Sequence, residues 1–153
     1  MLITNHVVGG AIIGSLSSSK RTAFAVGIVS HFALDAIPHM GVRDRTHFLT
    51  LAVIDGLIGA AAMAAIAKIA PTDKRGRVVA GMLGACLPDA DKPSREFFGG
   101  SPYPKWLDRA HDAIQTESPD KLGQEVLLAV LGGVVLVGTF LRRDHSRRGE
   151  GRR

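Results

Sequence analysis

The sequence predicts an all-α protein, a small membrane bundle of about five main helices and one short helix. Long apolar stretches are rich in small and aliphatic residues, with 18 glycines but only 5% aromatic residues, a mixture that lets helices pack closely in a membrane. No stretch shows the alternation of apolar and polar residues that a strand requires. At 153 residues the chain is expected to form one domain, with residues 1–141 as the helical membrane domain and 142–153 as a disordered basic tail.

Prolines and polar residues divide the apolar sequence into helices. Thr4 or Asn5 is the expected N-cap of the first helix, and Gly10 and Gly14 follow at a spacing typical of close helix packing. The segment 92–102 is rich in proline, glycine and charge and is expected to be a loop. The expected main helices are residues 5–16, 22–37, 46–70, 75–87 and 120–141, and the short helix is residues 105–116.

Two of these helices are long enough to span a bilayer, which needs about 20 apolar residues. Residues 48–70 are interrupted only by Asp55 and Lys68, and residues 126–141 contain no charge. The mean hydropathy of the whole chain is +0.16, which is modest for a membrane protein. The other main helices are shorter than a full span and could be buried in a bundle, reach only partway across or extend past these bounds. The protein is therefore predicted to be an integral membrane protein.

The basic clusters indicate an orientation. The tail 142–153 carries six arginines against Asp144 and Glu150, and alternating helix directions place it on the same side as Lys20–Arg21 and the basic residues at 74–77. The positive-inside tendency makes this side cytoplasmic, although six other basic residues lie on the opposite side. No aromatic residue interleaves with the tail arginines, so anionic lipid is the expected partner and nucleic acid is not.

His31, Asp35 and His39 are the first candidate metal ligands. They occur at i, i+4 and i+8, so a helix places them on one face. Polar groups of this kind need partners in an apolar helix. Imidazole nitrogen and carboxylate oxygen together suit a divalent metal, zinc first and manganese or iron as alternatives. Capping or ion pairing at the helix end is the other interpretation.

Asp89, Asp91 and His6 are expected on the same side of the bundle. Asp89 and Asp91 form an Asp-x-Asp pair directly after Pro88, a pattern that gathers a divalent cation or simply forms a surface turn. His6 lies in the first turn of the first helix. Because the helices alternate in direction, all six residues are expected to meet as metal ligands at one end of the bundle.

His111 and Asp55 are the candidate catalytic residues. His111 lies on the short helix, four residues before Gln115, where it can act as a general acid or base or be a solvated surface histidine. Asp55 is a lone carboxylate in a long apolar helix, and such a group must pair, protonate or bind something. The single cysteine, Cys86, excludes an internal disulfide.

Four motifs resemble the membrane-bound metal-dependent hydrolases, a family of small bacterial inner-membrane proteins. The motifs are Thr4-Asn5-His6 with Gly10 and Gly14, Ser30-His31-Phe32-Ala33-Leu34-Asp35-Ala36-Ile37-Pro38-His39, Gly84-Ala85-Cys86-Leu87-Pro88-Asp89-Ala90-Asp91, and His111-Asp112-Ala113-Ile114-Gln115. The resemblance implies a hydrolase in the bacterial inner membrane, with the histidines and aspartates of the motifs as ligands. Many members carry histidine where this chain has Lys92, so one ligand differs.

Three functions remain open from the sequence. The first is a metal-dependent hydrolase that acts on a lipid-like phosphoester, another ester or a small molecule at the membrane face. The second is a non-enzymatic membrane protein whose polar residues form a structural metal site or hydrogen-bond network. The third is an ion transporter with Asp55 in the pathway.

Overall fold

The structure is a computed structural model that describes residues 1–42 and 44–150, the last nine of these as backbone only. The described residues form seven α-helices, one 3₁₀ turn and two very short strands. The α-helices are α1 (Ile3–Leu16), α2 (Lys20–Asp35), α3 (Arg45–Ile69), α4 (Thr72–Cys86), α5 (Asp91–Phe98), α6 (Lys105–Ile114) and α7 (Leu122–Glu150). The turn η1 (Leu87–Ala90) joins α4 to α5, and β1 (His39–Met40) pairs in parallel with β2 (Glu117–Ser118).

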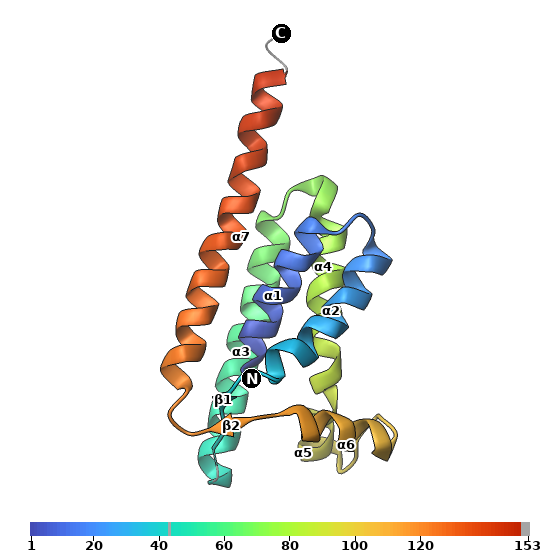
Figure 1. Cartoon of the computed structure of the whole chain (residues 1–153), viewed down its shortest axis with the longest axis vertical. Helices are drawn as coiled ribbons and strands as arrows, with labels where there is room; N and C mark the ends of the chain where they lie inside the picture. The colour runs from blue at the N-terminus through green and yellow to red at the C-terminus, as the bar shows by residue number, and fades with distance from the viewer. Residues whose placement is uncertain (43, 151–153) are drawn as a thin grey trace.

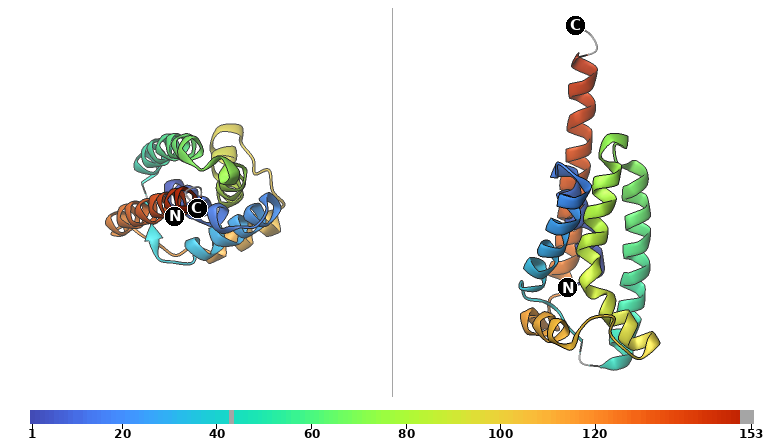
Figure 2. Two further views of the ribbon diagram at one scale, coloured as in Figure 1. Left: turned by 90° about the horizontal axis from the view of Figure 1, so that it is seen from above. Right: turned by 90° about the vertical axis from the view of Figure 1, so that its right-hand side faces the viewer.

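The all-α class expected from the sequence is confirmed. Helices α1, α3, α4 and α7 run along the long axis of the molecule, with α2 tilted beside α1 and α4 (Figure 1). The short helices α5 and α6 lie across one end of this bundle (Figure 2). The same end carries the first turn of α1, the last turn of α2 and η1.

Glycines bring α4 close to both α1 and α2. A Cβ built on Gly10 or on Gly27 would lie 2.5 Å from the carbonyl oxygen of Gly81, closer than real side chains approach. This contact confirms the close packing that the Gly10 and Gly14 spacing predicts. It also sets the distance between α2, which carries two residues of the polar cluster described below, and α4, which leads into η1.

The hydrophobic core lies between α1, α3, α4 and α7. Its buried members include Val7 on α1, Ile66 on α3, Met82 on α4 and Leu136 on α7. Helix α2 contributes little to this core and instead buries Ala23, Gly27, His31 and Asp35. The polar face of α2 is therefore turned into the bundle.

Helices α3 and α7 are long and apolar enough to cross a membrane over Arg45–Ile69 and Leu122–Leu141. Only a small part of either stretch is buried inside the molecule, whereas the core helix of a soluble protein is mostly buried. Leu57 on α3 and Val134 on α7 are 69% and 67% exposed. These exposed apolar faces are suited to contact with the hydrocarbon interior of a bilayer, in keeping with the expected membrane protein.

Two local expectations were wrong or incomplete. The segment 92–102 is not all loop, because α5 occupies Asp91–Phe98. Its Pro93 lies in the first turn, where proline is tolerated, and Gly99 ends the helix with a φ of 77°, a left-handed conformation that glycine adopts at low cost. Helix α1 begins at Ile3, after Leu2, and has no side-chain cap from Thr4 or Asn5.

The end of α7 also differs from the expected boundary at Leu141, because the helical backbone continues to Glu150. The side chains of residues 142–150 and all of residues 151–153 lie outside the described part of the chain. The disorder expected for the tail 142–153 stays a prediction.

Candidate metal centre

Three histidines and two aspartates from four different elements meet at the end of the bundle that α5 and α6 cover. They are His6 on α1, His31 and Asp35 on α2, Asp89 on η1 and His111 on α6. Four of them, His31, Asp35, Asp89 and His111, each offer one ligand atom, and these atoms all lie within 4.8 Å of one another. All four residues are buried.

Asp35 is the centre of this cluster. Its Oδ2 lies 3.2 Å from Nε2 of His31, which is one helical turn earlier on the same face of α2, and 3.0 Å from Nε2 of His111. Its Oδ1 lies 3.1 Å from Nε2 of His6, and the amino nitrogen of Met1 lies 3.0 Å from the same oxygen. The carboxylate thus joins α1, α2 and α6.

The ring of His31 is oriented by α4. Its Nδ1 lies 2.8 Å from the carbonyl oxygen of Ala85, and a carbonyl only accepts, so Nδ1 is the protonated nitrogen. Nε2 then presents a lone pair to the carboxylate of Asp35 and to Nε2 of His111, which is 3.0 Å away. This arrangement is repulsive unless a positive charge, either a further proton or a metal ion, lies between the groups.

A divalent metal fits this donor set. A backbone carbonyl that holds Nδ1 is the usual partner of a ligating histidine, because it fixes the tautomer and the ring orientation. Two ligand nitrogens each about 2.0 Å from a tetrahedral Zn²⁺ are about 3.3 Å apart, close to the distance between His31 and His111. Asp89 Oδ1 lies 3.7 Å from His31 Nε2 and 3.8 Å from His111 Nε2, so it borders the same space.

Lys92 borders the cluster from α5. Its Nζ lies 2.8 Å from Oδ1 of Asp89. Burial alone raises the pKa of Asp89, but the charges of Lys92, His31 and His6, together with the hydrogen bond from Lys92, hold that pKa below its usual value. Burial alone lowers the pKa of Lys92, but the charges of Asp89, Asp35 and Asp91, together with the hydrogen bond to Asp89, raise that pKa. The two groups therefore face each other as ammonium and carboxylate.

Three of the expected ligands, His6, His39 and Asp91, lie outside the group of four. His39 is on β1, where its Nδ1 donates to the carbonyl of Ile37 at 2.9 Å, and its buried Nε2 has no hydrogen-bond partner among the described residues. Oδ2 of Asp91 forms a 2.9 Å ion pair with Arg95. Their assignment as metal ligands stays a prediction.

Asp55 contacts the beginning of α1 rather than the four clustered residues. It accepts hydrogen bonds from the backbone nitrogens of Ile3 and Thr4 at 2.5 and 3.3 Å, and from the Thr4 hydroxyl at 2.5 Å. These nitrogens lack partners within the helix, so Asp55 caps α1 from α3. Its assignment as a catalytic residue stays a prediction.

Glu125 is a buried polar residue of this end of the bundle that the sequence did not single out. It is fully buried and accepts from the backbone nitrogens of Leu2 and Met40 at 2.6 and 2.7 Å. It thus ties α7 to the start of α1 and to β1. The available signal was a carboxylate in the first turn of an apolar helix, the same kind of signal that singled out Asp55.

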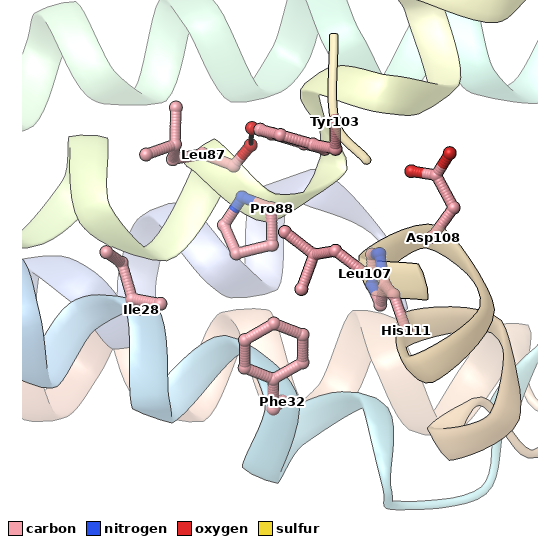
Figure 3. Close-up of a pocket in the computed structure, with 8 residues that line it drawn as sticks. All are labelled: Ile28, Phe32, Leu87, Pro88, Tyr103, Leu107, Asp108 and His111. Carbon is pink, nitrogen blue, oxygen red and sulfur yellow. Dashed lines mark hydrogen bonds between the residues drawn. The ribbon is translucent and has the colours of Figure 1, made fainter. Parts of the chain in front are cut away.

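An apolar pocket of about 180 Å³ adjoins the cluster. Figure 3 shows it between α2, η1 and α6, with His111 and Asp108 at one end and Ile28 and Leu87 at the other. Phe32 from α2 and Leu107 from α6 lie between these ends. His111 belongs both to this pocket and to the polar cluster. The complete lining is Ile28, Phe32, Leu87, Pro88, Tyr103, Leu107, Asp108 and His111.

The fold and the cluster define a class: an all-helical protein with two helices apolar enough to cross a membrane and a buried His/Asp group that could hold a metal ion. No protein-family model, no curated protein and no solved structure matches this chain. The function therefore has to be argued from the site itself.

Proposed function

We propose that this protein is a membrane-embedded metal-dependent hydrolase that acts on an amphiphilic phosphoester or another ester at the membrane face. The observation that carries the proposal is the contact among His31, Asp35 and His111. Their ligand atoms converge within a buried space, and the tautomer of His31 directs a lone pair into it. The resemblance to membrane-bound metal-dependent hydrolases supports the same function.

His31, Asp35, Asp89 and His111 are the proposed ligands, with Zn²⁺ as the first candidate and Mn²⁺ or Fe²⁺ as alternatives. The metal supplies Lewis acidity toward the scissile bond. His6 supports the site, because its Nε2 lies 3.1 Å from Asp35 and its ring stacks on that of His31 with centroids 4.0 Å apart. Ala85 holds His31 in its ligating tautomer.

The test is the metal content of the purified protein. We expect about one equivalent of divalent metal in detergent-purified protein by elemental mass spectrometry, and about a tenfold smaller content in a His31→Ala/Asp35→Ala variant. Asp112→Ala is the matched control, because Asp112 is a 59% exposed carboxylate on the same helix as His111. Circular dichroism establishes that each variant stays helical. Absence of metal from the folded wild-type protein, even after loading, would sink the proposal.

A second candidate function is a structural polar network without catalysis. The ion pair between Lys92 and Asp89 favours it, since it places a fixed positive charge on a proposed ligand. In that case protons, shared among the imidazoles and Asp35, supply the positive charge that the cluster needs. Asp35→Ala separates the two functions. A lower folded yield with no metal in the wild type favours the network, and a folded variant that has lost metal and hydrolysis favours the enzyme.

A further inference from the structure

We infer that the apolar pocket between α2, η1 and α6 binds the hydrocarbon chain of a single-chain anionic amphiphile whose head group lies at the His/Asp cluster. The placement of the head group rests on the proposed function. The chain-binding site stands on the pocket itself.

The shape and chemistry of the pocket match such a molecule. Its lining is almost entirely apolar over its length, and the polar groups of His111 and Asp108 lie together at one end (Figure 3). Burial of methylene groups removes apolar surface from water, so an alkyl chain is the ligand chemistry that gains most from these walls. A ligand with one polar end fits the polarity of the two ends.

The surroundings of the pocket also favour an alkyl chain as its ligand. Leu87, which lines the pocket, remains 43% exposed, so apolar surface continues from the pocket to the outside. The pocket lies at the end of the bundle where α3 and α7, the helices that could cross a membrane, begin (Figure 1). A chain from a lipid layer around these helices therefore has an apolar route into the pocket.

An anionic head group at this end rests on the proposed metal ion, which together with Lys92 would offset the carboxylates of Asp35 and Asp89. Lys92 is partly exposed, at 33% of its side chain, and lies 2.8 Å from Asp89. A phosphate on the amphiphile can pair with this ammonium while its chain extends along Phe32 and Leu107. An alkyl phosphate is thus the simplest molecule that satisfies both ends of the site.

The experiment is photolabelling of the full-length protein in nanodiscs with a dodecyl phosphate that carries a diazirine on its last carbon. We expect labels on the peptides that contain Ile28 and Leu87. Unlabelled dodecyl phosphate should abolish this labelling, and inorganic phosphate should leave it. Labelling spread over the exposed faces of α3 and α7 without competition would overturn the inference, as would equal competition by inorganic phosphate.

Two matched variants locate the chain. Ile28→Phe fills the pocket, and Val29→Phe adds the same bulk one residue later at a 66% exposed position. We expect the competing concentration of dodecyl phosphate to rise about tenfold in Ile28→Phe, the effect of about two lost methylene contacts, and to stay unchanged in Val29→Phe. Equal behaviour of the two variants would contradict the inference. Leu107→Phe fills the same pocket from α6 and serves if the α2 variant does not fold.

The same labelling in the presence of a chelator separates this inference from the proposed function. If the pocket is labelled in a protein that never binds metal, the chain-binding site is supported and the hydrolase proposal is rejected. If the protein binds metal and hydrolyses esters, but neither property depends on chain length or on Ile28→Phe, the hydrolase proposal is supported and the chain-binding site is rejected.

Discussion

Asp35 holds the cluster together at the scale of single residues. Its two oxygens lie within 3.2 Å of the imidazoles of His6, His31 and His111, and it is fully buried. A buried carboxylate is stable only with compensating charge and hydrogen bonds. The identity of that compensating charge, protons or a metal ion, decides the chemistry of the site.

His111→Ala distinguishes a ligand from an acid or base. We expect it to lower the metal content at least tenfold by elemental mass spectrometry, because His111 Nε2 lies 3.0 Å from both His31 Nε2 and Asp35 Oδ2. Arg109→Ala, an exposed change on the same helix, is the control and should keep the metal. If His111→Ala keeps the metal and loses only hydrolysis, the acid or base role expected from the sequence is the correct one.

Lys92→Met tests the positive charge at the position where many members of the family that the sequence resembles carry histidine. The ammonium of Lys92 competes with a metal ion for Asp89, and an opposed pair of unit charges at this separation is worth about 1 kcal/mol or more. We therefore expect metal affinity to rise about fivefold or more in competition with a coloured chelator. Lys105→Met, exposed on α6, should leave the affinity unchanged. Weaker binding in Lys92→Met would show that Lys92 supports the site.

The sequence predicted those residues of the site whose pattern involves only near neighbours in the chain. His31 and Asp35 were recognisable because one helical turn separates them, and Asp89 because it follows Pro88 in a helix-ending pattern. His39 has the same helical spacing in the sequence, but α2 ends at Asp35, before Pro38, and His39 lies on β1. His111 lies 76 residues from Asp35 along the chain, so only the folded chain shows that they touch.

At the scale of elements, the start of α1 is held by acidic residues of two other helices. Asp55 from α3 and Glu125 from α7 accept from the backbone nitrogens of Ile3 and Leu2. A sequence pattern predicts only a local cap such as Thr4 or Asn5, whereas these acceptors lie 52 and 123 residues away along the chain. The prolines and glycines that limit the other helices act locally, and those boundaries were predicted to within a few residues.

Asp55→Ala tests the capping role. We expect the free energy of unfolding to fall by about 1–3 kcal/mol, because partly buried donors lose their acceptor, and the metal content per folded molecule to be unchanged. Thermal unfolding in detergent and elemental mass spectrometry measure the two quantities. Loss of hydrolysis at unchanged stability would instead support the catalytic role expected for Asp55.

Gly27→Ala tests the close approach of α2 and α4. The new Cβ would lie 2.5 Å from the carbonyl oxygen of Gly81 and 3.0 Å from the nitrogen of Ala85. Overpacking of this kind costs about 1–3 kcal/mol, and it also displaces Ala85 from His31. We expect a lower unfolding temperature together with weaker metal binding. Gly133→Ala on α7 meets nothing within 4 Å and should be neutral or stabilising by up to about 1 kcal/mol.

At the scale of the whole molecule, the two ends of the bundle differ in chemistry. The polar cluster, the pocket and helices α5 and α6 are at one end. At the other end, Lys74 donates to the carbonyl of Ser15 at 2.6 Å and Arg77 to that of Ser17 at 2.8 Å, and the loop before α2 lies beside the start of α4. The separation of ligands from these basic residues follows from the alternation of helix directions, which is why the sequence could predict it.

The last prediction concerns how this polarity is placed in a membrane. In a Cys86→Ser background, Ser18→Cys and Gly100→Cys each add one thiol at an exposed position, at opposite ends of the bundle. If α3 and α7 span the bilayer with the basic end in the cytoplasm, a membrane-impermeant maleimide added to intact cells should label only Gly100→Cys. Permeabilisation should then expose Ser18→Cys. The reverse pattern would keep the spanning helices and invert the orientation, whereas equal labelling of both thiols before permeabilisation would contradict a transmembrane arrangement. A cluster that faces the cell exterior would take its metal and its amphiphile from the outer leaflet side, so this measurement also decides where the substrate has to be sought.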